Sequence, residues 1–159
     1  MIVYHGSSSK ITKFEIRNNT GYDQYGPGIY FTDKMTTARG YGRNVHAVDL
    51  DITRFIKPKA AIIRSKIVAM AKKADRDTLS NWSENRNEAL KMLTESLLNT
   101  DDMQDAMTSV WRDVFNLDNK KTCLEFVRQN IDGFIIQMTG EKFYTVFNPR
   151  TITIRDEEQ

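Results

Sequence analysis

The stretch GPGIYFTD, residues 26–33, places a tight turn directly before a short strand and decides how the first third of the chain folds. Glycine and proline favour the turn, and the run IYFT has the β-branched and aromatic residues that favour a strand. Thr32 and Asp33 are candidate N-caps for a helix over KMTTARGYG, which the glycines of that segment would end. Taken alone, Tyr30 is a packing residue of the strand.

The rest of the chain divides by its hydrophobic periodicity into three portions. Residues 1–58 contain the strand MIVYH and the alternating strand VHAVDLDI, and residues 131–155 contain three further strands, DGFIIQM, KFYTVFNP and TITIR. Residues 59–130 have the apolar spacing of helices, expected over residues 60–73, 83–98, 101–115 and 120–130. The pattern predicts an α+β fold in one domain over residues 1–159, with a four-helix insertion between the strands.

Two helical features have ordinary structural interpretations. The methionines and Trp111 at helical spacing favour a core stripe over a binding surface, and Thr100 is a candidate cap for the helix over 101–115. The single cysteine, Cys123, lies among apolar residues of an expected helix and is interpreted as a small buried hydrophobic residue.

Composition and motifs give no support to several classes of protein. The formal net charge of +2 gives no electrostatic footprint for nucleic-acid binding, and one cysteine excludes an internal disulfide. The chain has no phosphate-binding glycine motif and no nucleophile elbow, and neither histidine has an acidic residue at metal-ligand spacing, so no metal is expected. The N-terminus lacks the pattern of a signal peptide and no apolar run is long enough for a membrane span, so we expect a cytoplasmic location.

Four segments together resemble a known family. YHGS at 4–7, GPGIYFTDKMTTARGYG at 26–42, DGFII at 132–136 and FYTVFNP at 143–149 are similar to the ADP-ribosyltransferase fold. The branch they resemble includes poly(ADP-ribose) polymerases and the transferase domains of phage polyvalent proteins. The resemblance implies a split antiparallel β core with a helical insertion, NAD as co-substrate, and a phage or toxin-like role.

The resemblance also implies roles for residues of the first two segments. His5 would hydrogen-bond a hydroxyl of the adenosine ribose, Gly6 would offer its backbone to the nicotinamide carboxamide, and Ser7 is the third residue of the motif. Tyr30 and Tyr41 would pack on the two faces of the nicotinamide ring.

Two further residues complete the expected NAD site. Thr37 precedes Tyr41 by four residues, so both would point from one helical face, and the Thr37 hydroxyl would bond the carboxamide oxygen. Arg17, in the loop after the first strand, could contact the adenosine or the pyrophosphate.

The expected catalytic glutamate is missing from its usual place. Phe143 stands there, and Glu141 lies two residues earlier on the same face of a regular strand. Either Glu141 is recruited through a bulge or a bent strand end, or the site works without that carboxylate and Glu141 is a solvated residue.

The resemblance predicts an NAD-dependent mono-ADP-ribosyltransferase that modifies a macromolecule, a protein in preference to a nucleic acid, and releases nicotinamide. His5, Tyr30 and Glu141 are the candidate catalytic residues. Two alternatives remain: a weak or inactive module that keeps the NAD pocket and binds a partner through its helical insertion, and an NAD hydrolase.

Overall fold

The computed structural model describes residues 1–17 and 27–155. The chain forms two compact units, which we treat separately. The first contains Met1–Ile16, Gly28–Ile56 and Phe126–Gln159, and the second contains Arg17–Pro27 and Lys57–Glu125.

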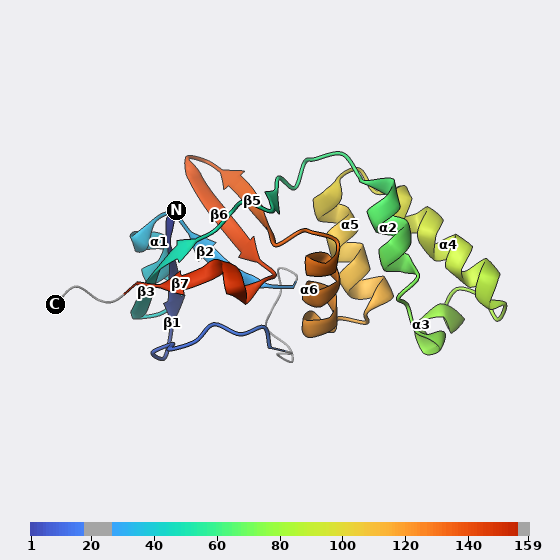
Figure 1. The fold of residues 1–159 in the computed structure, drawn as a ribbon, viewed down its shortest axis with the longest axis horizontal. Helices are drawn as coiled ribbons and strands as arrows, with labels where there is room; N and C mark the ends of the chain where they lie inside the picture. Colours follow the sequence, from blue (N-terminus) through green and yellow to red (C-terminus); the bar gives the residue numbers. More distant parts are fainter. Residues whose placement is uncertain (18–26, 156–159) are drawn as a thin grey trace. The chain divides into compact units, whose positions relative to one another are not determined.

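The first unit is built on a seven-stranded sheet with the strand order β4-β5-β6-β2-β1-β3-β7 (Figure 1). Its strands are β1 (Ile2–Ser7), β2 (Ile29–Thr32), β3 (Asn44–Leu50), β4 (Phe55–Ile56), β5 (Gly133–Met138), β6 (Glu141–Val146) and β7 (Ile152–Ile154). The pairings are antiparallel except between β4 and β5. Two described helices lie wholly within this unit, α1 (Met35–Arg39) and the short 3₁₀ helix η2 (Pro149–Thr151).

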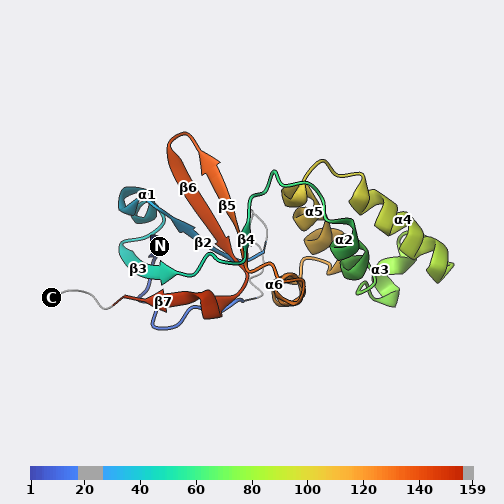
Figure 2. The same cartoon turned by 45° about the horizontal axis from the view of Figure 1, so that its top comes forward.

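The sheet is split between β1 and β2. β1 pairs with β3 along its whole length, but it pairs with β2 only at Tyr4↔Thr32. The strands therefore form two groups, in which β5 and β6 run beside β2 while β7 runs beside β3 (Figure 2). The predicted split in the β core is present.

The strands β5 and β6 form a tight hairpin that positions the start of β6. Thr139 and Gly140 have φ values of 37° and 75°, which are the left-handed conformations of a two-residue hairpin turn. The pairing then runs without interruption from Met138↔Glu141 to Gly133↔Val146. β6 is therefore a regular strand from Glu141 onward, and the bulge that was considered as a way to recruit Glu141 is absent from it.

One face of the sheet carries the core of the first unit. Val3, Phe31, Val48 and Tyr144 are all 2% exposed or less, and Phe14 from the loop after β1 packs on them. A second aromatic cluster joins Phe126, Phe134 and Phe147, whose rings lie 4.8–6.3 Å apart. These buried rings hold β5 and β6 in place.

The second unit is helical, and α6 runs from it into the first unit. Its elements are α2 (Arg64–Ala71), α3 (Arg76–Ser80), α4 (Arg86–Leu98), α5 (Met103–Ser109), the π-helix η1 (Val110–Val114) and the greater part of α6 (Asn119–Arg128). Met70, Met103 and Met107 are buried, as expected for a core stripe.

The helices differ from the expectation in four places. α3 lies in the gap between the expected helices over 60–73 and 83–98 and was not predicted, whereas η1 lies inside the expected helix over 101–115 and was not distinguished from it. The cap of α5 is Asp102, whose carboxylate accepts the N–H of Asp105, and not Thr100. At α1 the N-cap position is Lys34, and Thr32 contributes only by accepting the N–H of Lys34 at 3.1 Å. The α+β class is confirmed.

Candidate active site

The split in the sheet exposes a backbone edge at the His5–Gly6 step. Continuing the Tyr4↔Thr32 register would set Gly6 opposite Tyr30, but the strands diverge there. Instead, Nδ1 of His5 lies 2.7 Å from the carbonyl oxygen of Tyr30. The side of Gly6 that faces β2 is thus left outside the ladder between these two strands.

The contact with Tyr30 fixes the protonation of His5. A carbonyl oxygen only accepts, so Nδ1 of His5 carries the hydrogen and Nε2 presents a lone pair. Burial lowers the pKa of His5 below its usual value, against a smaller raising effect from the Tyr30 carbonyl. The ring is therefore neutral at pH 7. Phe14 and Phe31 pack on the ring at centroid distances of 5.2 and 5.4 Å and fix its orientation.

Gly6 is required by the packing of α1. A Cβ at position 6 would lie 1.8 Å from the carbonyl oxygen of Ala38, so only glycine lets the helix rest on β1. Gly42 makes a similar close approach to the backbone of Ser7. On the helix side of Gly6 the space is filled by α1, so the carboxamide contact that the resemblance implies would use the side of Gly6 that faces β2.

Glu141 is held by two threonine hydroxyls. Thr32 Oγ1, at the end of β2, donates to Glu141 Oε1 at 2.5 Å. Thr37 on α1 also hydrogen-bonds the carboxylate, and these two hydroxyls, Thr32 first, lower the pKa of Glu141. The carboxylate is therefore ionised at neutral pH and oriented by two separate elements.

Phe143 and Tyr30 lie on the same face of the sheet as Glu141. The pairing places Thr32 opposite Phe143 and Tyr30 opposite Thr145. Because side chains alternate along a strand, Tyr30, Thr32, Glu141 and Phe143 share one face. Phe143 and Tyr30 are half-buried. Glu141 therefore lies two residues before Phe143 on the same face of β6, as expected from the sequence.

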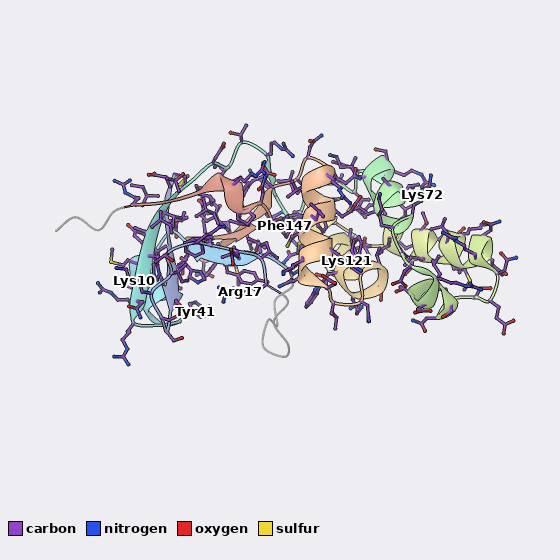
Figure 3. All side chains as sticks on the ribbon, turned by 60° about the horizontal axis from the view of Figure 1, so that its bottom comes forward. Lys10, Arg17, Tyr41, Lys72, Lys121 and Phe147 are labelled. Atoms are coloured by element: carbon purple, nitrogen blue, oxygen red, sulfur yellow. The ribbon has the colours of Figure 1, made fainter. Side chains whose placement is uncertain are left out.

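Tyr41 and Ser7 lie at the end of the unit where β1 ends and β3 begins. α1 ends at Arg39, so Tyr41 follows in a turn and is 68% exposed (Figure 3). A shared helical face with Thr37 is therefore not what places Tyr41. Ser7 pairs with Asn44, and its Oγ accepts the N–H of Ser9 at 3.2 Å.

Arg17 belongs to the second unit. Its backbone carbonyl accepts a hydrogen bond from the side chain of Asn119 at 3.0 Å. The site residues described above belong to the first unit, so a contact of Arg17 with NAD stays a prediction.

Thr32 is a site residue that was not predicted from the sequence. The sequence pattern favours Thr32 only as a helix cap. The two-residue spacing from Tyr30 indicates that Thr32 faces the same side of the strand as Tyr30. The role of Thr32 in the site depends on the long-range pairing of β2 with β6, which no local pattern reveals.

The first unit has the organisation of an ADP-ribosyltransferase. Its sheet is split, the His-Gly-Ser strand β1 lies at the split, and β6, which pairs with β2 across from it, carries a carboxylate. The sequence profile described as ADP-ribosyltransferase in polyvalent proteins matches residues 1–158. The chain belongs to this family, whose general activity is ADP-ribosyl transfer from NAD.

Other comparisons add little. No curated protein matches the chain significantly in sequence. A solved structure, "Crystal structure of an anti-CRISPR protein", aligns with 97% of this chain and 93% of its own, at 12% identity and a TM-score of 0.41. A likeness at that level carries no argument about function.

Two features were not found among the residues that the structure describes. No group of three or more His, Cys, Asp or Glu side chains in residues 1–17 and 27–155 is arranged to hold a metal ion. In the same part of the chain, no helix has the length and apolar character needed to cross a membrane.

Proposed function

We propose that this protein transfers a single ADP-ribose from NAD to a macromolecular acceptor, a protein in preference to a nucleic acid. The observation that carries the proposal is the Glu141 carboxylate, which Thr32 and Thr37 hold ionised on the same strand face as Phe143. This fixed negative charge, two residues before the usual glutamate position that Phe143 occupies here, supports the proposal.

The transfer breaks one bond and forms one. The bond between the ribose C1′ and the nicotinamide nitrogen breaks, and its electron pair leaves with neutral nicotinamide. The acceptor atom then bonds C1′ and its proton is released to solvent. Because C1′ becomes positively charged in the transition state, the Glu141 carboxylate would stabilise it electrostatically.

The residues at the split fit NAD in chemical type. The lone pair on Nε2 of neutral His5 suits a hydrogen-bond-donating ribose hydroxyl. The β2-facing edge of Gly6 has the N–H and C=O that a carboxamide can pair with in the plane of the strand. Tyr30 supplies an aromatic wall on the Glu141 face.

Phe143 supports transfer of one ADP-ribose rather than chain growth. Building a chain requires a base for the incoming ribose hydroxyl, and phenylalanine has no group that accepts a proton. Glu141 lies two residues earlier, about 6.6 Å along the strand at ~3.3 Å per residue, so it serves C1′ from a displaced position. Action in the reducing cytoplasm of a phage host is consistent with the lone buried Cys123.

The test is incubation with adenine-labelled NAD in a cell lysate, with Glu141→Gln as the variant and Glu95→Gln on α4 as the matched control. Label on protein is expected for wild type and for Glu95→Gln, with a rate ~10²–10³ lower for Glu141→Gln. Equal rates would remove Glu141 from catalysis. Free ADP-ribose alone would indicate a hydrolase, and unchanged NAD would indicate a binding module.

A further inference from the structure

A second recess lies on the flank of α1 away from Glu141. Its volume is about 310 Å³, and its floor is formed by Tyr4 of β1 with Val45 and Ala47 of β3. Met35 and Arg39 on α1 form one wall, whereas Thr37 on the same helix turns toward Glu141. Residues two apart on a helix project about 200° apart, so α1 separates the two sites. We refer to this recess as the β3 groove.

Three cationic side chains from three elements line the β3 groove. Lys10 comes from the loop after β1, Arg39 from the last turn of α1, and Arg43 from the residue before β3. Figure 3 labels Lys10 at the same side of the first unit as Tyr41. No carboxylate of the described residues lines the groove.

These cations have no anionic partners among the residues that the structure describes. No ion pair involves Lys10, Arg39 or Arg43, and the polar contact of the Arg39 guanidinium is with the Met35 thioether at 3.4 Å. Like charges gathered in a recess repel each other, and an anionic ligand removes that repulsion. Arginine forks match phosphate oxygens in two-pronged geometry.

The residues at the floor of the β3 groove indicate which chemical group accompanies the phosphate in the ligand. Val45 and Ala47 are apolar, and Tyr4 adds an aromatic ring beside them. A site with cations at the rim and an apolar floor suits a phosphate group attached to an organic part rather than a free inorganic ion.

We infer that the β3 groove binds a phosphate ester through Arg39, Arg43 and Lys10. The phosphate could come from two sources, the diphosphate of NAD or a phosphate on the acceptor. The second source rests on the transferase proposal, but phosphate binding itself does not. The backbone of α1 rests directly on Gly6, so a ligand reaching from the Glu141 flank to the groove must pass around an end of the helix.

Binding is tested by NMR, following backbone amides of the full chain during titration with inorganic pyrophosphate. Saturable shifts are expected in the segment from Arg39 to Ala47, weakening as salt is added. The double variant Arg39→Gln/Arg43→Gln should bind at least about tenfold more weakly, because a hydrogen bond to a charged group contributes that factor or more. Arg86→Gln on α4 is the matched control and should bind as wild type.

Charge-preserving and functional controls keep the outcome clear. Arg39→Lys/Arg43→Lys should retain part of the affinity, since the charge remains while the fork is lost. Absence of saturable shifts, or equal affinity in the Gln double variant, would overturn the inference. Because this measurement needs no transfer reaction, it can fail while NAD turnover is normal, and it can succeed in a protein that turns over no NAD.

Competition then identifies the source of the phosphate. If NAD displaces pyrophosphate from the groove, the site binds the diphosphate of NAD, and the Gln double variant should raise the KM for NAD. If NAD and pyrophosphate bind together, the phosphate belongs to the acceptor. Either result keeps the groove as a phosphate site.

Discussion

Thr32 fixes the direction of the hydrogen bonds around Glu141. Its Oγ1 already accepts the N–H of Lys34 at 3.1 Å, so its own hydrogen is available for the carboxylate at 2.5 Å. A donor aimed at a carboxylate favours the ionised form. Thr32 is 3% exposed, and water therefore does not replace this bond easily. Thr32 is in this sense a positioning residue for Glu141.

Replacing Thr32 tests that role. Thr32→Val keeps the shape of the side chain but removes the donor, so NAD turnover should fall about tenfold or more. The pKa of Glu141 should rise toward its usual 4.5, which moves the acid limb of kcat/KM to higher pH. Thr32→Ser should restore both. A rate loss in Thr32→Val without a shift of the pH profile would mean that Thr32 acts only through packing.

The neutral state of His5 predicts a pH dependence of NAD binding. Burial puts the folded-state pKa below 6.5, so the unfolded chain takes up the proton first, and stability falls as the pH drops below 6.5 toward the folded value. Within the folded protein, protonation removes the Nε2 lone pair. NAD affinity should then weaken about fivefold, the contribution of one ordinary hydrogen bond. Calorimetric titration of His5→Gln, which has no such proton, should show no corresponding loss, and an equal pH dependence in both proteins would contradict the assignment.

At the scale of elements, α1 lies between the two sites and contributes a residue to each, and its position is set by its contact with Gly6. Contact between the Ala38 carbonyl and Gly6 sets the height of the helix above β1. From that position Thr37 reaches the carboxylate of β6 on one flank, and Arg39 lines the β3 groove on the other. A change at Gly6 should therefore affect both flanks of the helix.

Gly6→Ala tests this packing. A methyl group 1.8 Å from a backbone oxygen forces α1 outward, and overpacking of this kind costs roughly 1–3 kcal/mol. Urea unfolding should show that loss, together with reduced NAD turnover. Gly140→Asn in the β5–β6 turn is the control, because a Cβ there meets nothing within 4 Å and asparagine accepts a positive φ. If Gly6→Ala were as stable as wild type, α1 would not be seated on β1 as described.

Local patterns predicted the elements that have strong periodicity and missed those that depend on distant partners. IYFT matches β2 residue for residue, and the alternation around Val48 identifies β3. The two-residue strand β4 has no pattern of its own and exists because Phe55 pairs with Gly133. In the same way, the Thr32–Glu141 bond joins residues 109 apart, so local patterns name Glu141 as a candidate but do not reveal the contact that holds it.

At the scale of the whole molecule, the chain leaves the sheet after β4 and returns through α6, and both crossings are anchored within the first unit. Arg54 forms an ion pair with Asp132 at 3.5 Å and donates to the carbonyl of Val127 at 3.0 Å. The Asp132 N–H in turn donates to the Arg54 carbonyl at 2.9 Å. These contacts hold the two ends of the insertion together at the sheet, so the inserted segment can form a core of its own.

Each unit can be followed by probes of its own. Both tryptophans of the chain, Trp82 and Trp111, and its one cysteine, Cys123, lie in the second unit. Cys123 is 1% exposed, and burial raises the pKa of its thiol, so almost no thiolate is present in the folded state. We therefore expect the thiol to react with a disulfide reagent only when the helical unit opens. In urea, the midpoint of pulsed thiol labelling should coincide with that of tryptophan fluorescence, while an NMR signal of His5 reports on the first unit. Rapid labelling in native buffer, at the rate of the denatured chain, would show that Cys123 is not in the core of the second unit.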